Sequence, residues 1–239
     1  MRDIPHNGDL RGAKPERVAR RDTDWQQVEI YRHPVYGGQL VIDGDLQISE
    51  SDFAYDTAMT APVLTLAECR RVGILGGGDG GVLRELLTAS ERLSRPVEQA
   101  VLVDIDATVI ELCREHLPAL CGDAFDDPRA QVIVGDAFAW VDQARELDAV
   151  IYDLTMEPVR DDMAREAFIH ETLARVRNSL RTGGIFSMQA CGELEPDREQ
   201  LLEEIRRGVH EHFNECREQT VMIPSYGELW TFIAARKAA

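Results

Sequence analysis

The chain has 239 residues, of which 44% are hydrophobic and 29% are charged. These proportions are typical of a globular protein and exclude a disordered, collagen-like or fibrous chain. No apolar run approaches the roughly 18 residues that a membrane span requires. Residues 1–5 also lack the apolar segment of a signal peptide. We therefore expect no membrane partner and no secretion.

The five cysteines are scattered along the chain, odd in number and without a CxxC pair. This pattern argues against a disulfide framework and against a zinc module. It indicates a protein of the reducing cytoplasm that binds no metal.

Net charge is the first property that bears on function. The 26 lysines and arginines are outnumbered by 43 aspartates and glutamates, which gives a formal charge of −17. Such a surface repels a phosphate-rich polymer, so nucleic acid is not an expected partner, whereas a small cationic substrate is attracted. Acidity also serves solubility alone, so charge favours this class of substrate without establishing it.

Residues 1–62 are expected to form a flexible arm and a small β-hairpin unit. The first part, 1–23, is polar and without periodicity, which is typical of a mobile arm. Two alternating apolar runs, 28–31 and 39–42, flank a turn at Pro34. Such a pattern predicts a hairpin.

We expect a third short strand at 46–48, followed by a helix with Ser51 as its N-cap that is interrupted near Pro62. The second unit then covers residues 63–239. In that unit apolar strand runs alternate with helical segments. We expect strands at 72–75, 100–103, 132–134, 149–152, 185–188, 220–223 and 229–235, and helices at 80–92, 107–117, 162–181 and 197–213. Gly183-Gly184 should terminate the third of these helices.

Strands that are apolar on both faces and alternate with helices indicate a parallel sheet covered on both sides. We therefore predict an α/β fold, a Rossmann-like, methyltransferase-type sandwich with a mostly parallel sheet. The small N-terminal β unit precedes this nucleoside-binding catalytic domain.

The turn after the first strand of this domain carries the strongest single motif, Ile74-Leu75-Gly76-Gly77-Gly78-Asp79-Gly80-Gly81. Glycines at a strand-to-helix turn let a ligand approach the backbone where a Cβ would block it. Gly76, Gly78 and Gly81 fit the GxGxxG of dinucleotide-binding proteins. With Gly80 as the third glycine, the motif fits instead the GxGxG of enzymes that use a sulfonium nucleoside. The motif alone predicts a nucleoside-type ligand and leaves both classes open.

Four aspartates favour the sulfonium class: one lies in the glycine loop and three lie at the ends of strands. Asp79 lies within the glycine loop, where a carboxylate repels a pyrophosphate and attracts an ammonium or sulfonium group. Its alternative role is a helix cap. Asp104, Asp136 and Asp153 end the next three strands, at the edge of the sheet where open α/β folds bind ligands. Asp104 is placed for ribose hydroxyls and Asp136 for the adenine amine, whereas Asp106 is the expected cap of the next helix.

Further segments combine with this loop into a wider pattern over residues 25–235: Trp25–Val28, Leu40–Gln47, Asp52–Tyr55, Gly76–Glu85, Asp126–Arg129, Gly135–Phe138 and Pro224–Tyr226. In order and spacing they resemble the spermidine synthase family. The resemblance implies an aminopropyltransferase that moves the aminopropyl group of decarboxylated S-adenosylmethionine to a polyamine such as putrescine and releases methylthioadenosine. It also implies a homodimer or homotetramer.

The resemblance assigns roles to individual residues. On the nucleoside side it implies contacts from Gln26, Gln47, Gly76, Gly78, Gly80, Asp104, Asp136 and Ala137. On the amine side, Asp79 would hold the ammonium group of the donor, and Asp153 would be the catalytic acid. Tyr55 and Tyr226 would line the amine-binding cleft, with Tyr55 also at the catalytic centre.

Three departures from the family pattern fall on the amine side. The DSSDPxGP-like loop reads Asp153-Leu154-Thr155-Met156-Glu157-Pro158-Val159 here, so either Glu157 replaces the second acid after a one-residue shift or Met156 has removed it. The Tyr-His/Gln-Glu triplet reads Tyr55-Asp56-Thr57, and the β unit is shorter than usual. The acceptor amine therefore stays open. The alternatives are an N-methyltransferase or aminocarboxypropyl transferase that uses intact S-adenosylmethionine, and a nucleoside-binding protein without catalysis.

Overall fold

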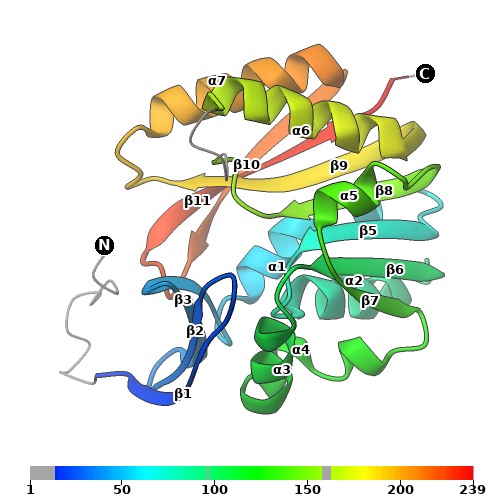
Figure 1. Cartoon of the computed structure of the whole chain (residues 1–239). Helices are drawn as coiled ribbons and strands as arrows, with labels where there is room; N and C mark the ends of the chain where they lie inside the picture. Colours follow the sequence, from blue (N-terminus) through cyan, green and yellow to red (C-terminus); the bar gives the residue numbers. More distant parts are fainter. Residues whose placement is uncertain (1–13, 96, 158–162, 239) are drawn as a thin grey trace.

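The small N-terminal sheet has four antiparallel strands in the order β1-β2-β3-β4 (Figure 1). The computed structural model describes residues 14–95, 97–157 and 163–238. The strands of this sheet are β1 (Glu16–Asp22), β2 (Gln27–His33), β3 (Gly37–Ile42) and β4 (Asp45–Ser49). The hairpin and the third strand predicted from the sequence are confirmed.

The predicted mobile arm is wrong over β1. Residues 16–22 form a strand because they pair with β2, and Arg17 reaches across to Glu29 at 2.7 Å between Nη1 and Oε1. A polar strand of this kind has no apolar alternation for the sequence to reveal, since it is ordered by its neighbour. Residues 1–13 of the predicted arm lie outside the described residues.

The first helix, α1 (Phe53–Thr60), follows Asp52 and not Ser51, so the predicted cap is wrong. Asp52 is fully buried and its carboxylate accepts hydrogen bonds from the backbone N–H of Ser49 and of Ser225. The carboxylate therefore ties the start of α1 to the last β turn of the chain. A short turn, η1 (Val63–Thr65), then leads into the large sheet.

The large sheet has seven strands in the order β10-β11-β9-β8-β5-β6-β7. The five strands β5 to β9 run parallel, and β11 and β10 are added antiparallel at one side. Their bounds are β5 (Arg71–Gly76), β6 (Gln99–Asp104), β7 (Ala130–Val134), β8 (Leu147–Asp153), β9 (Leu180–Gly192), β10 (Glu215–Ile223) and β11 (Glu228–Arg236). The predicted α/β sandwich with a mostly parallel sheet is confirmed.

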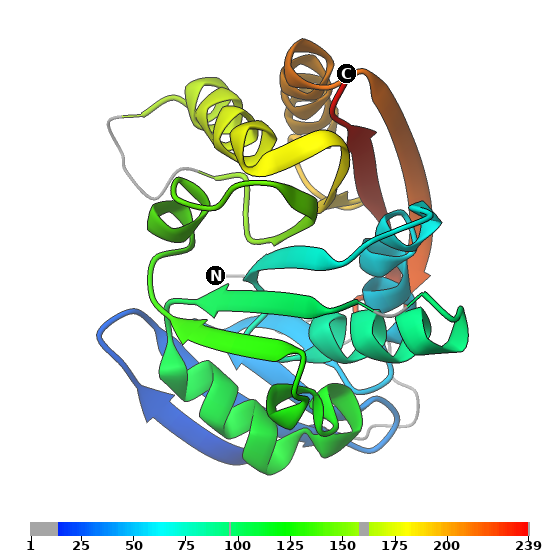
Figure 2. The ribbon, with the colours of Figure 1, turned by 90° about the vertical axis from the view of Figure 1, so that its right-hand side faces the viewer.

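Helices cover both faces of this sheet (Figures 1 and 2). On one face lie α1, α2 (Gly81–Arg92), α3 (Ala107–His116), α4 (Pro118–Cys121) and the turn η2 (Ala124–Asp126). The other face carries α5 (Ala137–Val141), α6 (Arg165–Ser179) and α7 (Arg198–His212). Successive residues of a strand point to opposite faces, so Ile74 packs in the first core and Leu75 in the second. Among the described residues, no helix is long and apolar enough to cross a membrane.

The end of α6 differs from the sequence prediction. The helix stops at Ser179 and the chain enters β9 at once, so Gly183-Gly184 lies inside a strand and does not terminate the helix. At Gly184 a Cβ would come within 2.9 Å of the Arg181 carbonyl oxygen and 3.1 Å of the Asp148 carbonyl oxygen. Glycine is therefore needed there for close strand pairing.

Candidate active site

The glycine loop joins β5 to α2 and brings the ends of three strands together. Gly76 and Gly80 have φ of 80° and 82°, the left-handed region that glycine adopts without strain. A Cβ on Gly76 would collide with the backbone of Asp153, and one on Gly78 would lie 2.7 Å from the carboxylate of Asp104. The loop can therefore pack against the carboxyl ends of β6 and β8 only with glycine at these positions.

Three of the predicted acids meet at this edge of the sheet. Asp79 accepts the backbone N–H of Gly81 at 2.8 Å. Asp104, at the end of β6, accepts the backbone N–H of Gly78 at 2.9 Å. Asp153 ends β8 and accepts the hydroxyl of Tyr55 at 2.6 Å. The three carboxylates therefore lie around one loop, close enough to repel one another.

This acid cluster, Asp79, Asp104 and Asp153, shifts the protonation of its members. Burial, and then the charge of Asp79, raise the pKa of Asp153 to about 7, against the hydrogen bond from Tyr55. Burial raises the pKa of Asp79 and of Asp104 as well. A positively charged ligand among them would stabilise all three anions, which is the arrangement expected where a cation binds.

Two tyrosines border the cluster. Burial, and then the charge of Asp153, raise the pKa of Tyr55 well above its usual value, so its hydroxyl stays a proton donor to that carboxylate. The ring of Tyr55 packs edge-on against Phe232 of β11, with centroids 5.2 Å apart. The Tyr226 hydroxyl donates to the carbonyl of Gln47, which links the β10–β11 turn to the small sheet.

Four other predicted residues lie away from the cluster or have polar partners of their own. Gln26 donates to the carboxylate of Asp106, the N-cap of α3, at 3.2 Å. Gln47 is exposed and its amide donates to the Asp45 carbonyl at 3.1 Å. Asp136 is exposed at the N-cap of α5, just before the buried Ala137, and accepts two backbone N–H groups. Contact of these three residues with a nucleoside therefore stays a prediction.

Glu157 is the fourth, and its carboxylate has a cationic partner. Its Oε1 lies 2.9 Å from Nη1 of Arg165 at the start of α6, and the same guanidinium pairs with Glu204 of α7. Met156 beside it is buried. The structure therefore leaves Asp153 as the acid of this loop that faces Tyr55, and Glu157 is held toward the helices.

Sequence reasoning missed Gln189, which holds the loop after Asp153. Its amide donates to the Leu154 carbonyl at 3.0 Å and accepts the indole N–H of Trp230 at 3.0 Å. Gln189 follows the predicted fifth strand at the same edge as the acids. The aspartates were selected because they end predicted strands. Gln189 would have been found in the same way if polar uncharged residues had been considered too.

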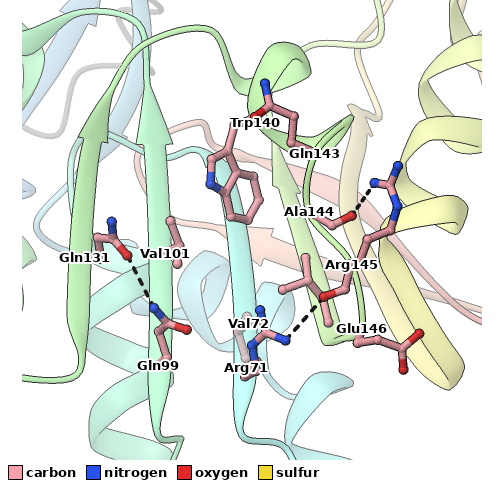
Figure 3. Close-up of a pocket in the computed structure, with 11 residues that line it drawn as sticks. Arg71, Val72, Gln99, Val101, Gln131, Trp140, Gln143, Ala144, Arg145 and Glu146 are labelled. Atoms are coloured by element: carbon pink, nitrogen blue, oxygen red, sulfur yellow. Dashed lines mark hydrogen bonds between the residues drawn. The ribbon is translucent and has the colours of Figure 1, made fainter.

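A separate cavity of about 550 Å³ opens at the opposite, amino-terminal ends of the strands (Figure 3). Trp140, Val101 and Leu147 line it, beside the hydrogen-bonded amides of Gln99 and Gln131. It contains none of the clustered acids, so we place the candidate active site at the carboxyl ends. Within residues 14–95, 97–157 and 163–238, no three or more His, Cys, Asp or Glu side chains are arranged to hold a metal ion.

The fold and the site together define a class. A Rossmann-like sandwich places its ligand at the carboxyl ends of the strands, and clustered carboxylates at that edge favour a ligand that bears positive charge. Residues 52–239 match the family described as "Spermine/spermidine synthase domain". The chain therefore belongs to the spermine/spermidine synthase family, whose curated relatives are transferases.

Individual relatives agree with this assignment. The chain is 37% identical over 215 residues to the polyamine aminopropyltransferase of Aeropyrum pernix, covering 88% of this chain and 66% of that protein. It is 36% identical over 220 residues to polyamine aminopropyltransferase 1 of Hyperthermus butylicus, covering 89% and 72%. The chain thus spans about two thirds of the length of the first of these relatives.

Solved structures show the same fold. Spermidine synthase from Thermotoga maritima superposes with a TM-score of 0.76 at 27% identity, covering 93% of this chain and 73% of that one. A spermidine synthase in complex with the transition-state analogue AdoDATO gives a TM-score of 0.81 at 26% identity, covering 95% and 75%. The family and the fold expected from the sequence are both confirmed.

Proposed function

We propose that the chain is an aminopropyltransferase that moves the aminopropyl group of decarboxylated S-adenosylmethionine to a polyamine such as putrescine and releases methylthioadenosine. The curated relatives are named polyamine aminopropyltransferases, which supports the activity. The observation that carries the proposal is the acid cluster around the glycine loop, with Asp153 hydrogen-bonded to Tyr55 at 2.6 Å. We further propose a cytoplasmic enzyme that acts as a homodimer or homotetramer.

The donor binds along the carboxyl ends of β5, β6 and β7 in this proposal. Its backbone-facing contacts come from the loop of Gly76, Gly78 and Gly80, whose missing Cβ atoms let the loop pack closely against the strand ends that carry the acids. Asp104 binds the ribose hydroxyls and Asp79 the ammonium group of the aminopropyl arm. Asp136 and Ala137 lie at the adenine edge, and Gln26 and Gln47 close the nucleoside site from the small sheet.

The acceptor amine must lose a proton before it reacts. An aliphatic ammonium has a pKa of about 10.4 and lacks a lone pair, whereas attack on the carbon beside sulfur needs one. A buried pocket lowers the pKa of the ammonium, and the Asp153 carboxylate accepts its proton. The freed lone pair then forms the C–N bond as the C–S bond breaks. Sulfur leaves as a neutral thioether, so the reaction requires neither a metal ion nor a redox step.

The acceptor itself is held by Tyr55, Asp153 and Tyr226, and Glu157 is the further candidate for its outer end. Tyr55 keeps the Asp153 carboxylate oriented toward the attacking nitrogen. Most of the acceleration then comes from holding the nitrogen in line with the departing sulfur. Glu157 can contact the amine only if its salt bridge with Arg165 breaks.

Product analysis by mass spectrometry tests this function. The enzyme is incubated with decarboxylated S-adenosylmethionine and a panel of diamines and polyamines. We expect methylthioadenosine and an amine longer by one aminopropyl unit. Release of S-adenosylhomocysteine with a methylated product from intact S-adenosylmethionine, and no reaction with the decarboxylated donor, would establish the methyltransferase alternative instead.

A further inference from the structure

A buried ion pair lies behind the glycine loop, between α1 and α2. Oδ2 of Asp56 is 3.1 Å from Nη2 of Arg84, with the two side chains 1% and 20% exposed. Arg84 also donates to the Ala119 carbonyl at 3.0 Å and lies over the ring of Phe53, 5.0 Å from its centroid. The guanidinium is thus fixed in place by groups other than Asp56.

The two carboxylate oxygens of Asp56 differ in their hydrogen bonds. Oδ1 is buried and accepts no hydrogen bond among the described residues. It faces Gly81, where a Cβ would lie only 2.7 Å away, and the backbone N–H of Gly81 donates to Asp79 on its other side. One glycine therefore separates the two carboxylates, and a buried carboxylate with only one of its oxygens hydrogen-bonded is costly to keep.

The charges of this ion pair reach the proposed ammonium site. Burial, and then the charge of Asp79, raise the pKa of Asp56 well above its usual value, and the paired Arg84 only partly offsets this rise. Arg84 also lowers the pKa of Asp79, so the guanidinium acts on both carboxylates. A cation bound at Asp79 would remove the repulsion between the two acids and favour the ionised form of Asp56.

We propose that Asp56 neutralises the Arg84 guanidinium behind the loop and thereby sets the preference for decarboxylated over intact S-adenosylmethionine. The inference rests on the proposed function and makes Asp56 a positioning residue that acts through Arg84 and Asp79. The two donors differ by one carboxylate. An uncompensated Arg84 would compete with the donor ammonium for Asp79 and would attract the extra carboxylate of the intact form.

The test is the ratio of dissociation constants for the two donors, measured by titration calorimetry. The wild-type protein should bind the decarboxylated donor more tightly. In Asp56→Asn, which keeps the side-chain shape, we expect this ratio to narrow by about tenfold or more, with a larger change in KM for the donor than in kcat. A ratio within twofold of the wild type would overturn the inference.

Two further variants separate charge from structure. The double variant Asp56→Asn with Arg84→Gln removes both charges, and the wild-type ratio should return; a ratio as narrow as in Asp56→Asn contradicts the inference. Because this variant leaves no unpaired buried charge, it should fold even if the single one does not, and a ratio more than about threefold narrower than in the wild type would then overturn the inference. The matched control is Asp148→Asn, which breaks the Asp148–Arg181 pair far from the loop and should leave the ratio unchanged. A wild-type protein that prefers the intact donor would refute the proposed function itself.

Discussion

The two ends of strand β8 carry one aspartate each, and their surroundings are opposite. At the amino end, Asp148 accepts the backbone N–H groups of Arg70 and Arg71 at 2.8 Å and pairs with the Arg181 guanidinium. Burial raises the pKa of Asp148, but these donors outweigh it and lower the pKa overall. At the carboxyl end, burial and Asp79 raise the pKa of Asp153 to about 7. Within the described residues, the Asp148 carboxylate is paired with an arginine, whereas the Asp153 carboxylate accepts from a tyrosine hydroxyl and has no cationic partner.

We propose that this difference separates a residue that stabilises the fold, Asp148, from a residue that takes part in the reaction, Asp153. Linkage gives the two aspartates opposite pH dependence. The stabilisation from Asp148 is present above its unfolded pKa of about 4 and is lost as pH falls through its lower folded pKa. The contribution from Asp153 is present below about pH 4 and is lost as pH rises to about 7.

The largest expected effect is on turnover, in Asp153→Asn. An amide cannot accept the proton of the attacking amine, so kcat/KM should fall by about 10²- to 10⁴-fold. The variant should melt at the same temperature as the wild type or higher, because a repelled buried carboxylate is removed. Rates from methylthioadenosine release and melting by circular dichroism check both. Turnover within threefold of the wild type would exclude Asp153 as the base.

Asp148→Asn should show the reverse pattern. Losing the charge that pairs with Arg181 and accepts two backbone N–H groups should cost about 3 kcal/mol of unfolding free energy. For a chain of this size, that corresponds to a drop in Tm of roughly 6–12 °C. Activity per folded molecule should be retained at a permissive temperature. An unchanged Tm with lost activity would contradict the proposed stabilising role of Asp148.

Tyr55→Phe should have a smaller effect that sharpens the comparison. The hydroxyl of Tyr55 lowers the pKa of Asp153, so its removal should raise that pKa further and leave less carboxylate at neutral pH. We expect kcat to fall by about 10- to 100-fold and the acidic limb of its pH profile to move to higher pH. A lower kcat with an unmoved pH profile would confine Tyr55 to binding.

The smallest effect is expected for Glu157→Gln. Because Arg165 holds this carboxylate, and an exposed ion pair contributes about 1 kcal/mol at most, KM for the amine should change by less than about threefold. Steady-state kinetics with the preferred amine checks this. A rise of more than tenfold would show that Glu157 turns into the cleft and replaces the second acid of the family loop.

Local sequence patterns predicted much of the fold, and they predicted the glycine loop and the strand-end aspartates of the site. Apolar runs that end in aspartate located β6 and β8, and the glycine loop located the turn between β5 and α2. Long-range pairing was out of reach. Strand β1 is polar and owes its order to β2, and β9 begins before Gly183 because it pairs with β8 from Leu180 onward.

The same limit applies within the site. Tyr55 and Asp153 are 98 residues apart in sequence, so their spacing does not predict that they meet. Only the resemblance to a family placed both at one site. The partners of Glu157 and Asp56 are single arginines on helices, and a sequence rich in arginine does not reveal which one each acid meets. Charge pairing depends on which helix faces which, a property of the packed fold.

Nuclear magnetic resonance titration of the aspartate carboxyl carbons, with and without decarboxylated S-adenosylmethionine, is the most direct test of the acid cluster. We expect Asp153 to titrate near pH 7 in the free protein and its pKa to fall when the cationic donor binds. An Asp153 carboxyl that titrates near pH 4 and does not respond to the donor would contradict it.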